Sequence, residues 1–172
     1  DFRDYESDSE NCNLKIPAVR FPRWNYCPFC GTMQKVGLFT KQPKCDAYQW
    51  PHGRKCDASK RYRRSLIPER FVVVCPEGHI DDFPWVKWVH CQSFGGRKPI
   101  CFKPELTITT SSSASEGLEG LTLKCLTCGA TASLRGAFEP EMFRELDKKT
   151  SYQYDFRCTG KHPWKHKTEA CR

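Results

Sequence analysis

The chain has 172 residues, a formal net charge of +8 and a hydrophobic fraction of 38%. This length favours one domain or two small ones, and the longest clean apolar run, Phe71 to Val74, is too short for a membrane span or a signal-peptide core. Aliphatic residues are scarce, yet 12 cysteines, 5 histidines and 5 tryptophans exclude a disordered composition. Something other than aliphatic burial must therefore help to hold the chain together.

Carboxylates dominate the first segment, so we expect residues 1–19 to form an acidic, solvated lead-in. A zinc-ribbon-like subdomain is expected to follow over residues 20–66. A central and C-terminal zinc-binding subdomain would then occupy residues 67–172.

Two Cys-x-x-Cys-Gly motifs carry the strongest chemical signal. Cys27-Pro-Phe-Cys30-Gly and Cys125-Leu-Thr-Cys128-Gly each place two thiolates at the spacing that lets one tight turn chelate a tetrahedral zinc ion. Metal ligation rather than disulfide formation favours a reducing, cytoplasmic setting.

The nearest further thiols complete the first predicted site. Cys45 and Cys56 follow Cys27 and Cys30 in a loop rich in Lys, Arg and Pro, so we predict a four-cysteine site, with His52 as the substitute ligand. A short strand is expected over residues 36–39 between the knuckle and these thiols.

The middle of the chain offers a second set of ligands. Residues 70–75 are expected to form a buried strand, and residues 80–90 a short helix with Asp82 as its cap and Pro84 in its first turn. Such a helix would bring a histidine back towards the end of the strand. We therefore predict a site made by Cys75, His79, His90 and Cys101, with Cys91 as the alternative to Cys101; His90 could instead cap its own helix.

The second knuckle, Cys125 and Cys128, needs two ligands from the C-terminal end. Candidates there are Cys158, His162, His166 and Cys171, of which we assign Cys158 and Cys171. Three zinc ions are expected in all, while Cys12 and Cys91 are interpreted as buried small hydrophobic residues.

A competing model for the pairing comes from a repeated motif. Cys75-x-x-x-His79 and Cys158-x-x-x-His162 are each followed by Pro-Trp, and each comes after one of the knuckles. An internal duplication would relate the two halves of the chain.

The remaining elements complete an α+β prediction. Alternating patterns predict strands over residues 106–110 and 121–124 and a last strand over 152–156, while a helix is expected over 140–146. The expected fold is small and zinc-stabilised, with short antiparallel strands, zinc knuckles and a few short helices.

One basic cluster is a candidate for nucleic-acid binding. It consists of Arg54, Lys55, Lys60, Arg61, Arg63 and Arg64, interleaved with Tyr62 and opposed by one carboxylate. Such cations can contact several phosphates. The alternatives are a solvated loop that balances the acidic lead-in, or contact with an acidic partner subunit.

Two longer motifs stand out: Arg-Phe-Pro-Arg-Trp-Asn-Tyr-Cys-Pro-Phe-Cys-Gly at residues 20–31 and Pro-Glu-Arg-Phe-Val-Val-Val-Cys-Pro-Glu-Gly-His-Ile-Asp-Asp-Phe-Pro-Trp at residues 68–85. With these motifs, and with residues 125–138 and 158–164, the sequence resembles the DrmB family of the bacterial DISARM anti-phage system. Family members are much longer, so this chain would be their cysteine-rich portion. The resemblance implies a module that supports DNA binding together with a helicase-like partner subunit.

We expect no enzymatic activity. Both Cys-x-x-Cys motifs precede strand-like segments rather than the helix that a thiol oxidoreductase requires, and the His-x-Glu motif of a zinc deaminase does not precede Pro-Cys-x-x-Cys. The alternative is a metal-dependent hydrolase in which a zinc near His79 works with Asp81 or Asp82. A catalytic zinc keeps an open position, whereas this sequence supplies ligands in excess.

Overall fold

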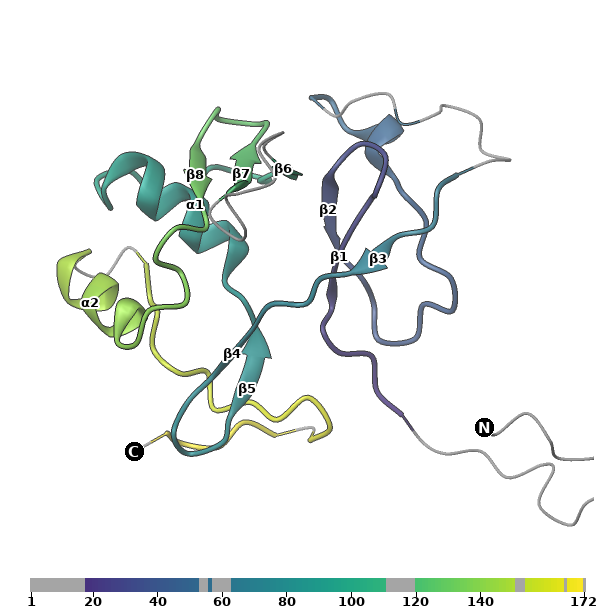
Figure 1. Cartoon of the computed structure of the whole chain (residues 1–172). Helices are drawn as coiled ribbons and strands as arrows, with labels where there is room; N and C mark the ends of the chain where they lie inside the picture. Colours follow the sequence, from purple (N-terminus) through teal and green to yellow (C-terminus); the bar gives the residue numbers. More distant parts are fainter. Residues whose placement is uncertain are drawn as a thin grey trace, which may run out of the picture.

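The computed structural model describes residues 18–52, 56, 63–110, 120–150, 154–165 and 167–171. The strands are β1 (Trp24–Tyr26), β2 (Thr32–Lys35), β3 (Ile67–Pro68), β4 (Val72–Val74), β5 (Ile80–Asp82), β6 (Leu106–Thr110), β7 (Leu121–Cys125) and β8 (Thr131–Ser133). The helices are η1 (Ala47–Gln49), α1 (Trp85–Phe94) and α2 (Met142–Lys149) (Figure 1). The predicted α+β class with short antiparallel strands is confirmed. Within the described part of the chain, no helix is long and apolar enough to span a bilayer.

A six-stranded antiparallel sheet in the order β3-β1-β2-β6-β7-β8 organises most of the molecule. Its middle pairing joins β2 to β6, with Thr32 opposite Thr107 and Met33 opposite Leu106. The sheet thus takes strands from both sides of residue 66. The β4–β5 hairpin stands apart, and the C-terminal segment runs beside it (Figure 1).

The main core lies between α1 and the β6–β8 part of the sheet. Trp85 and Trp88 are fully buried there against residues such as Leu106 and Leu123, and the Trp88 indole N–H donates to the Ser133 carbonyl oxygen at 3.0 Å. Large aromatic side chains bury much apolar area per residue. They supply a core that the scarce aliphatic residues alone do not.

Helix α1 begins later than the helix expected over residues 80–90, because residues 80–82 form β5, and the expected cap is also wrong. Pro84 precedes the helix, no side chain caps its first turn, and Gly95 ends it in the left-handed conformation. Asp82 lies in β5 instead. Its carboxylate accepts hydrogen bonds from the backbone N–H groups of Arg23 and Trp24 and so does not cap the helix.

Two expected strands are absent from the described part of the chain. Residues 36–39 form no strand: β2 ends at Lys35, Val36 turns into the first cysteine cluster, and Phe39 is exposed. The described residues 154–156 form no strand because Tyr154 is buried and its hydroxyl donates to the Lys98 carbonyl oxygen.

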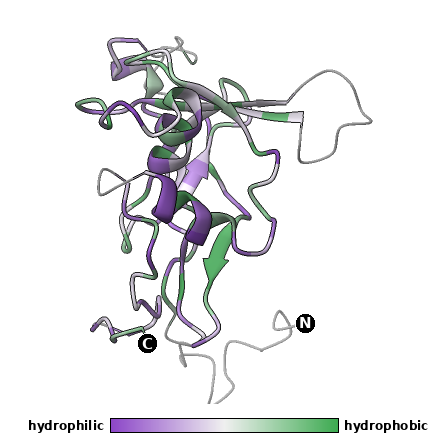
Figure 2. Cartoon of the chain, turned by 90° about the vertical axis from the view of Figure 1, so that its left-hand side faces the viewer, coloured by the Kyte–Doolittle hydropathy of each residue, from purple (hydrophilic) through white to green (hydrophobic). Residues whose placement is uncertain are grey.

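Strand β4 is shorter than the strand predicted over residues 70–75, and helix α2 is shifted relative to the helix predicted over 140–146. Strand β4 covers only three valines and is half-buried, with Val74 63% exposed, because a two-stranded hairpin covers one face only. Helix α2 begins at Met142 rather than at Pro140 and buries no residue fully. Figure 2 shows α2 as mostly hydrophilic.

Candidate metal centres

Four buried cysteines form the first cluster. Cys27, Cys30, Cys45 and Cys56 place their sulfur atoms within 4.8 Å of one another, with Cys27 to Cys56 and Cys30 to Cys45 each at 3.6 Å. A tetrahedral zinc with Zn–S bonds of about 2.3 Å has S···S edges of about 3.8 Å. The four thiols therefore already have nearly the separation that a shared ion imposes.

The turn that carries Cys27 and Cys30 depends on glycine. The Gly31 N–H donates to the Cys27 carbonyl oxygen at 2.8 Å, and Gly31 has a φ of 72°. A Cβ atom at this position would lie 2.2 Å from the Ile108 carbonyl oxygen. Only glycine allows both the left-handed turn and this close approach of strand β6.

The thiol pKa values show that this cluster does not ionise fully by itself. Burial, with a further contribution from neighbouring thiols, raises the pKa of Cys45 far above its ordinary value and that of Cys56 to about 12. Cys27 has a lowered pKa because backbone N–H groups of Cys30 and Phe29 outweigh its burial. A divalent cation is the natural partner that would allow all four thiolates to form.

The second cluster joins the β4–β5 hairpin to the C-terminal segment. Cys75, His79, Cys158 and Cys171 bring their donor atoms within 4.8 Å of one another. The His79 Nδ1 lies 3.2 Å from the Cys75 sulfur, and the Cys171 sulfur lies 3.8 Å from it. Unlike the first cluster, this one is open to solvent, because Cys158 and Cys171 are exposed.

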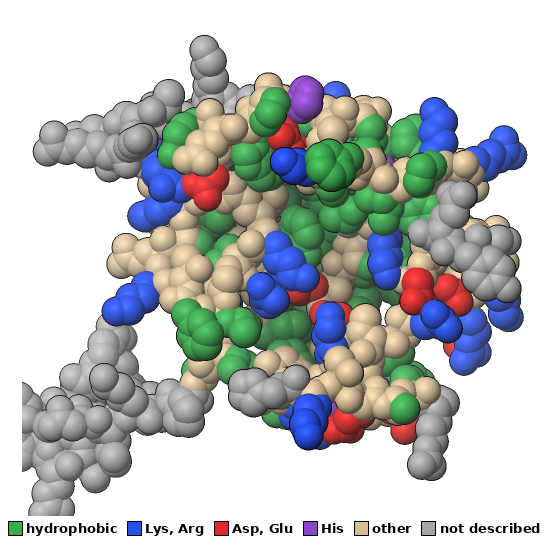
Figure 3. All heavy atoms as spheres, turned by 180° about the vertical axis from the view of Figure 1, so that it is seen from behind, with side chains coloured by type: hydrophobic (Ala, Val, Ile, Leu, Met, Phe, Trp, Pro, Cys, Tyr) green, Lys and Arg blue, Asp and Glu red, His purple; other side chains and the backbone are tan. Residues whose placement is uncertain are grey.

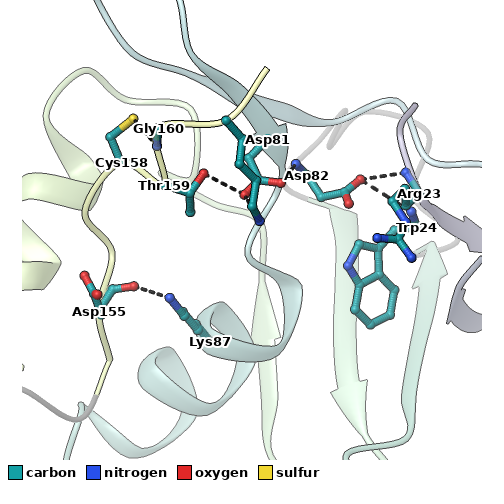
Figure 4. A network of polar contacts seen from close by, with 10 residues as sticks. Arg23, Trp24, Asp81, Asp82, Lys87, Asp155, Cys158, Thr159 and Gly160 are labelled. Atoms are coloured by element: carbon teal, nitrogen blue, oxygen red, sulfur yellow. Dashed lines mark hydrogen bonds and ion pairs between the residues drawn. The ribbon is translucent and has the colours of Figure 1, made fainter. Parts of the chain in front are cut away.

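Backbone and carboxylate contacts fix the C-terminal segment against the hairpin. The Ile80 N–H donates to the Lys161 carbonyl oxygen at 2.8 Å. The Asp81 carboxylate accepts from the Thr159 hydroxyl at 2.8 Å and pairs with the Lys161 ammonium at 2.9 Å. Figure 4 shows Thr159 reaching Asp81 beside Cys158. These contacts bring Cys158 to the hairpin rather than to the second knuckle.

The third cluster lies between α1 and the second knuckle. His90, Cys101, Cys125 and Cys128 place their donor atoms within 4.8 Å of one another. The His90 Nε2 lies 3.2 Å from the Cys101 sulfur and 3.4 Å from the Cys128 sulfur. The Nδ1 atom of His90 is 2.7 Å from the Val86 carbonyl oxygen, which can only accept. Nδ1 therefore donates, and Nε2 keeps the lone pair that a metal ion needs.

The thiol pKa values in the second and third clusters are also shifted, some upward and one downward, as in the first cluster. Burial and the Cys125 and Cys128 thiols raise the pKa of Cys101 to about 12, and contact with Cys158 and Cys75 raises that of Cys171 to about 12. Despite burial, the backbone and ring of His79 lower the pKa of Cys75 to about 7. Each cluster therefore has thiols that stay protonated unless a cation is present.

The pairing predicted for the second and third sites is wrong. Cys75 and His79 meet Cys158 and Cys171, whereas His90 and Cys101 meet Cys125 and Cys128. The physical reason is the course of α1, which leads away from the hairpin and packs on β8 through Trp88. The twelve predicted ligands are therefore the same, but those of the second and third sites combine differently. The two Cys-x-x-x-His motifs, which begin at Cys75 and Cys158, lie side by side in the second cluster.

Among the described residues, none of the alternative ligands belongs to the three four-donor groups, although the donor atoms of His162, His79 and Glu169 also lie within 4.8 Å of one another. His52 is exposed and lies 3.6 Å from a Glu105 oxygen, while Cys91 is buried and its burial raises the pKa of the thiol. Cys12 and His166 lie outside the described residues. His162 stacks against His79, and its Nε2 lies 3.6 Å from Glu169. The sequence analysis missed Glu169, for which no spacing signal exists.

Only two members of the basic cluster lie in the described part of the chain. Arg63 pairs with Asp46, donates to the Cys45 carbonyl oxygen at 3.1 Å and lies over the Tyr48 ring. Arg64 lies over the Phe29 ring at 5.4 Å. Arg54, Lys55, Lys60 and Arg61 fall outside the described residues.

Together the fold and the clusters define a small α+β domain built around three Cys/His groups that can hold metal ions. The donor sets, one of four sulfurs and two of three sulfurs and one nitrogen, are those of closed tetrahedral sites.

The chain belongs to a family described as a domain of unknown function (DUF8724), whose model matches residues 1–172. It is also 32% identical over 151 residues to the DISARM protein DrmB of Bacillus paralicheniformis. That match covers 87% of this chain and 23% of DrmB, so the chain spans about a quarter of the length of this curated relative. The resemblance to the DrmB family is thereby confirmed.

Proposed function

We propose that this chain is the zinc-binding structural and interaction module of a DrmB-like defence protein and that it holds three zinc ions. One observation carries the proposal: twelve Cys and His side chains, drawn from distant parts of the sequence, fall into three groups of four with near-tetrahedral spacing. Sulfur-rich, four-donor sets are typical of structural zinc. The similarity to the DISARM protein DrmB supports the defence setting.

A structural rather than catalytic role agrees with the environment of the second cluster. Four protein donors fill a tetrahedral site, which leaves no position for an activated water. Asp81 is held by Thr159 and Lys161, which together with a backbone N–H lower the pKa of its carboxyl in spite of burial. Asp82 is occupied by backbone N–H groups of β1. Neither carboxylate is available as the base that a hydrolase near His79 requires.

We further propose that the module supports DNA binding in the cytoplasm, together with a helicase-like partner subunit. Figure 3 shows Lys and Arg side chains spread over one face with acidic groups among them, so the described surface has no single large basic patch there. The sequence cluster between Arg54 and Arg64 is therefore the favoured contact for phosphates. Within this cluster, Arg63 is engaged with Asp46 and the Cys45 carbonyl oxygen.

Two measurements test the proposal. Native mass spectrometry identifies and counts the bound metal. Binding of the full-length protein to duplex DNA is then measured against salt, with and without the helicase-like subunit, for a Lys60→Ala/Arg61→Ala/Arg64→Ala variant. Each lost phosphate contact should reduce the salt slope by about 0.9. The matched control, Lys124→Ala/Lys148→Ala/Lys149→Ala, should leave it unchanged, and an unchanged slope in the first variant contradicts the DNA-binding role.

A further inference from the structure

A cavity of about 380 Å³ opens beside the first knuckle. Its walls come from β1, the knuckle turn, the segment after β3 and the end of β6, and they include Tyr26, Phe29, Glu69, Arg70, Phe71 and Leu121. Cavities of this size hold small planar groups, bounded by apolar walls with a few polar contacts. The cavity is separate from the ligand atoms of the second and third clusters.

One of the residues that line this cavity is a buried acidic side chain, Glu69. Glu69 is only 5% exposed, and its backbone N–H, bonded to the Trp24 carbonyl oxygen at 2.9 Å, fixes it next to β1. Burial raises the pKa of this carboxyl, although a hydrogen bond from the Arg70 backbone offsets part of that effect. A carboxylate with two oxygens can accept further hydrogen bonds, so the cavity favours a ligand that brings N–H donors.

An aromatic platform lies next to this carboxylate. Phe29 sits inside the first knuckle, between Cys27 and Cys30, and is 63% exposed. The Arg64 guanidinium lies over its ring at 5.4 Å, and Arg70, which lines the cavity, is also exposed. Exposed aromatic rings beside Arg side chains are the usual platform on which unpaired bases stack.

We infer that this cavity binds one unpaired base of a DNA strand, a base that carries an exocyclic amino group. The amino group donates to the Glu69 carboxylate, the base stacks on Phe29, and Arg64 and Arg70 face the phosphates of the strand. The inference rests on the proposed function, because it names a contact through which the module meets DNA. Arg70, which lines the cavity, and Arg64, which lies over the Phe29 ring, repel a basic peptide, the other ligand that a buried carboxylate attracts.

Cytosine and thymine provide a sharp comparison because they have similar size. Cytosine presents an amino group at the position where thymine presents a carbonyl oxygen, and a carbonyl oxygen facing Glu69 is repelled. In fluorescence anisotropy, the zinc-loaded full chain should bind a 12-nucleotide oligo-dC about tenfold more tightly than oligo-dT, within the range expected for one good base contact.

Variants separate the two contacts. Glu69→Gln should reduce the preference for oligo-dC to about twofold or less, because an amide can also donate to thymine. Phe29→Ala should weaken both oligonucleotides by about tenfold, and Phe29→Trp should retain or strengthen both. Phe39→Ala, at another exposed phenylalanine, is the control and should change neither. Native mass spectrometry of each variant checks that its metal content is unchanged.

Several results would overturn the inference. Equal binding of oligo-dC and oligo-dT by the unaltered chain contradicts it, as does displacement of oligo-dC from the cavity by an oligo-arginine peptide that loses affinity in Glu69→Gln. Binding to duplex but not to single strands overturns this inference while the proposed function stands. Failure to bind any DNA, alone or with the partner subunit, removes both.

Discussion

The Asp82 carboxylate accepts a hydrogen bond of 2.8 Å from the backbone N–H of Arg23, 59 residues away in the sequence. A second bond, of 3.4 Å, comes from the N–H of Trp24 (Figure 4). Strand β5, next to the second cluster, is thereby tied to strand β1, which leads into the first cluster. One carboxylate thus links the elements that carry the two clusters, β1 and the β4–β5 hairpin, in addition to the apolar contacts that both make with the main core.

Asp82→Ala should therefore destabilise the metal-loaded chain. The change leaves backbone donors of β1 without their partner, so we expect a loss of about 1–3 kcal/mol in the free energy of unfolding. Asp82→Asn should lose less because its amide oxygen can still accept. Glu77→Ala, at an exposed position near the same hairpin, is the control in denaturant titrations. Equal stability of the Asp82→Ala and Glu77→Ala variants would show that the link is unimportant.

Metal counts in double variants test how the ligands are paired. Cys171→Ser should retain two of three ions, and Cys75→Ser/Cys171→Ser should also retain two, because both residues belong to one cluster. Cys128→Ser/Cys171→Ser should retain only one. Native mass spectrometry gives the counts directly. Two ions in the Cys128/Cys171 variant and one in the Cys75/Cys171 variant would restore the pairing inferred from sequence.

The second cluster should release its metal first. Cys158 and Cys171 are both exposed, whereas the third cluster has one exposed cysteine, Cys128, and all four cysteines of the first cluster are buried. A chelator therefore reaches the second site without prior unfolding. An excess of a coloured zinc-chelating indicator, mixed with the zinc-loaded protein, should report one fast ion followed by two slow ions. Cys171→Ser should remove the fast phase only. Release of all ions in a single phase would contradict this order.

Metal affinity should rise with pH. In the metal-free protein Cys56, Cys101 and Cys171 have pKa values of about 12, so at neutral pH each of them loses a proton when metal binds. The lowered pKa of Cys75, about 7, makes its thiolate available above that pH and removes it as pH falls further. Between pH 8 and pH 6, affinity should fall by at least about tenfold per unit. Competition titrations with a chelator of known affinity check this, and a flat profile would argue against thiolate ligation.

Local spacing was enough to predict the knuckles and several strands. A Cys-x-x-Cys-Gly turn is specified by a few consecutive residues, and the alternation in residues 106–110 and 121–124 matches β6 and β7. The first cluster also follows from proximity, because its four cysteines lie within 30 consecutive residues.

The pairing in the other two clusters depends on contacts that no local pattern encodes. Asp81 attracts Thr159 and Lys161 across about 80 residues, and Trp88 reaches Ser133 across 45. These contacts send the C-terminal segment to the hairpin and His90 to the second knuckle. The repeat of Cys-x-x-x-His at residues 75 and 158 suggested an internal duplication, not the meeting of the two motifs that the structure shows.

The central claim is that bound metal, rather than apolar packing alone, gives the chain its structure. A two-dimensional ¹H–¹⁵N NMR spectrum, recorded at neutral pH under reducing conditions before and after removal of metal by a chelator, tests this claim most directly. We predict that the dispersed spectrum collapses on chelation and returns in full when three equivalents of zinc are added. A spectrum that remains dispersed in the metal-free protein, with all thiols accessible to reagent, would contradict the account.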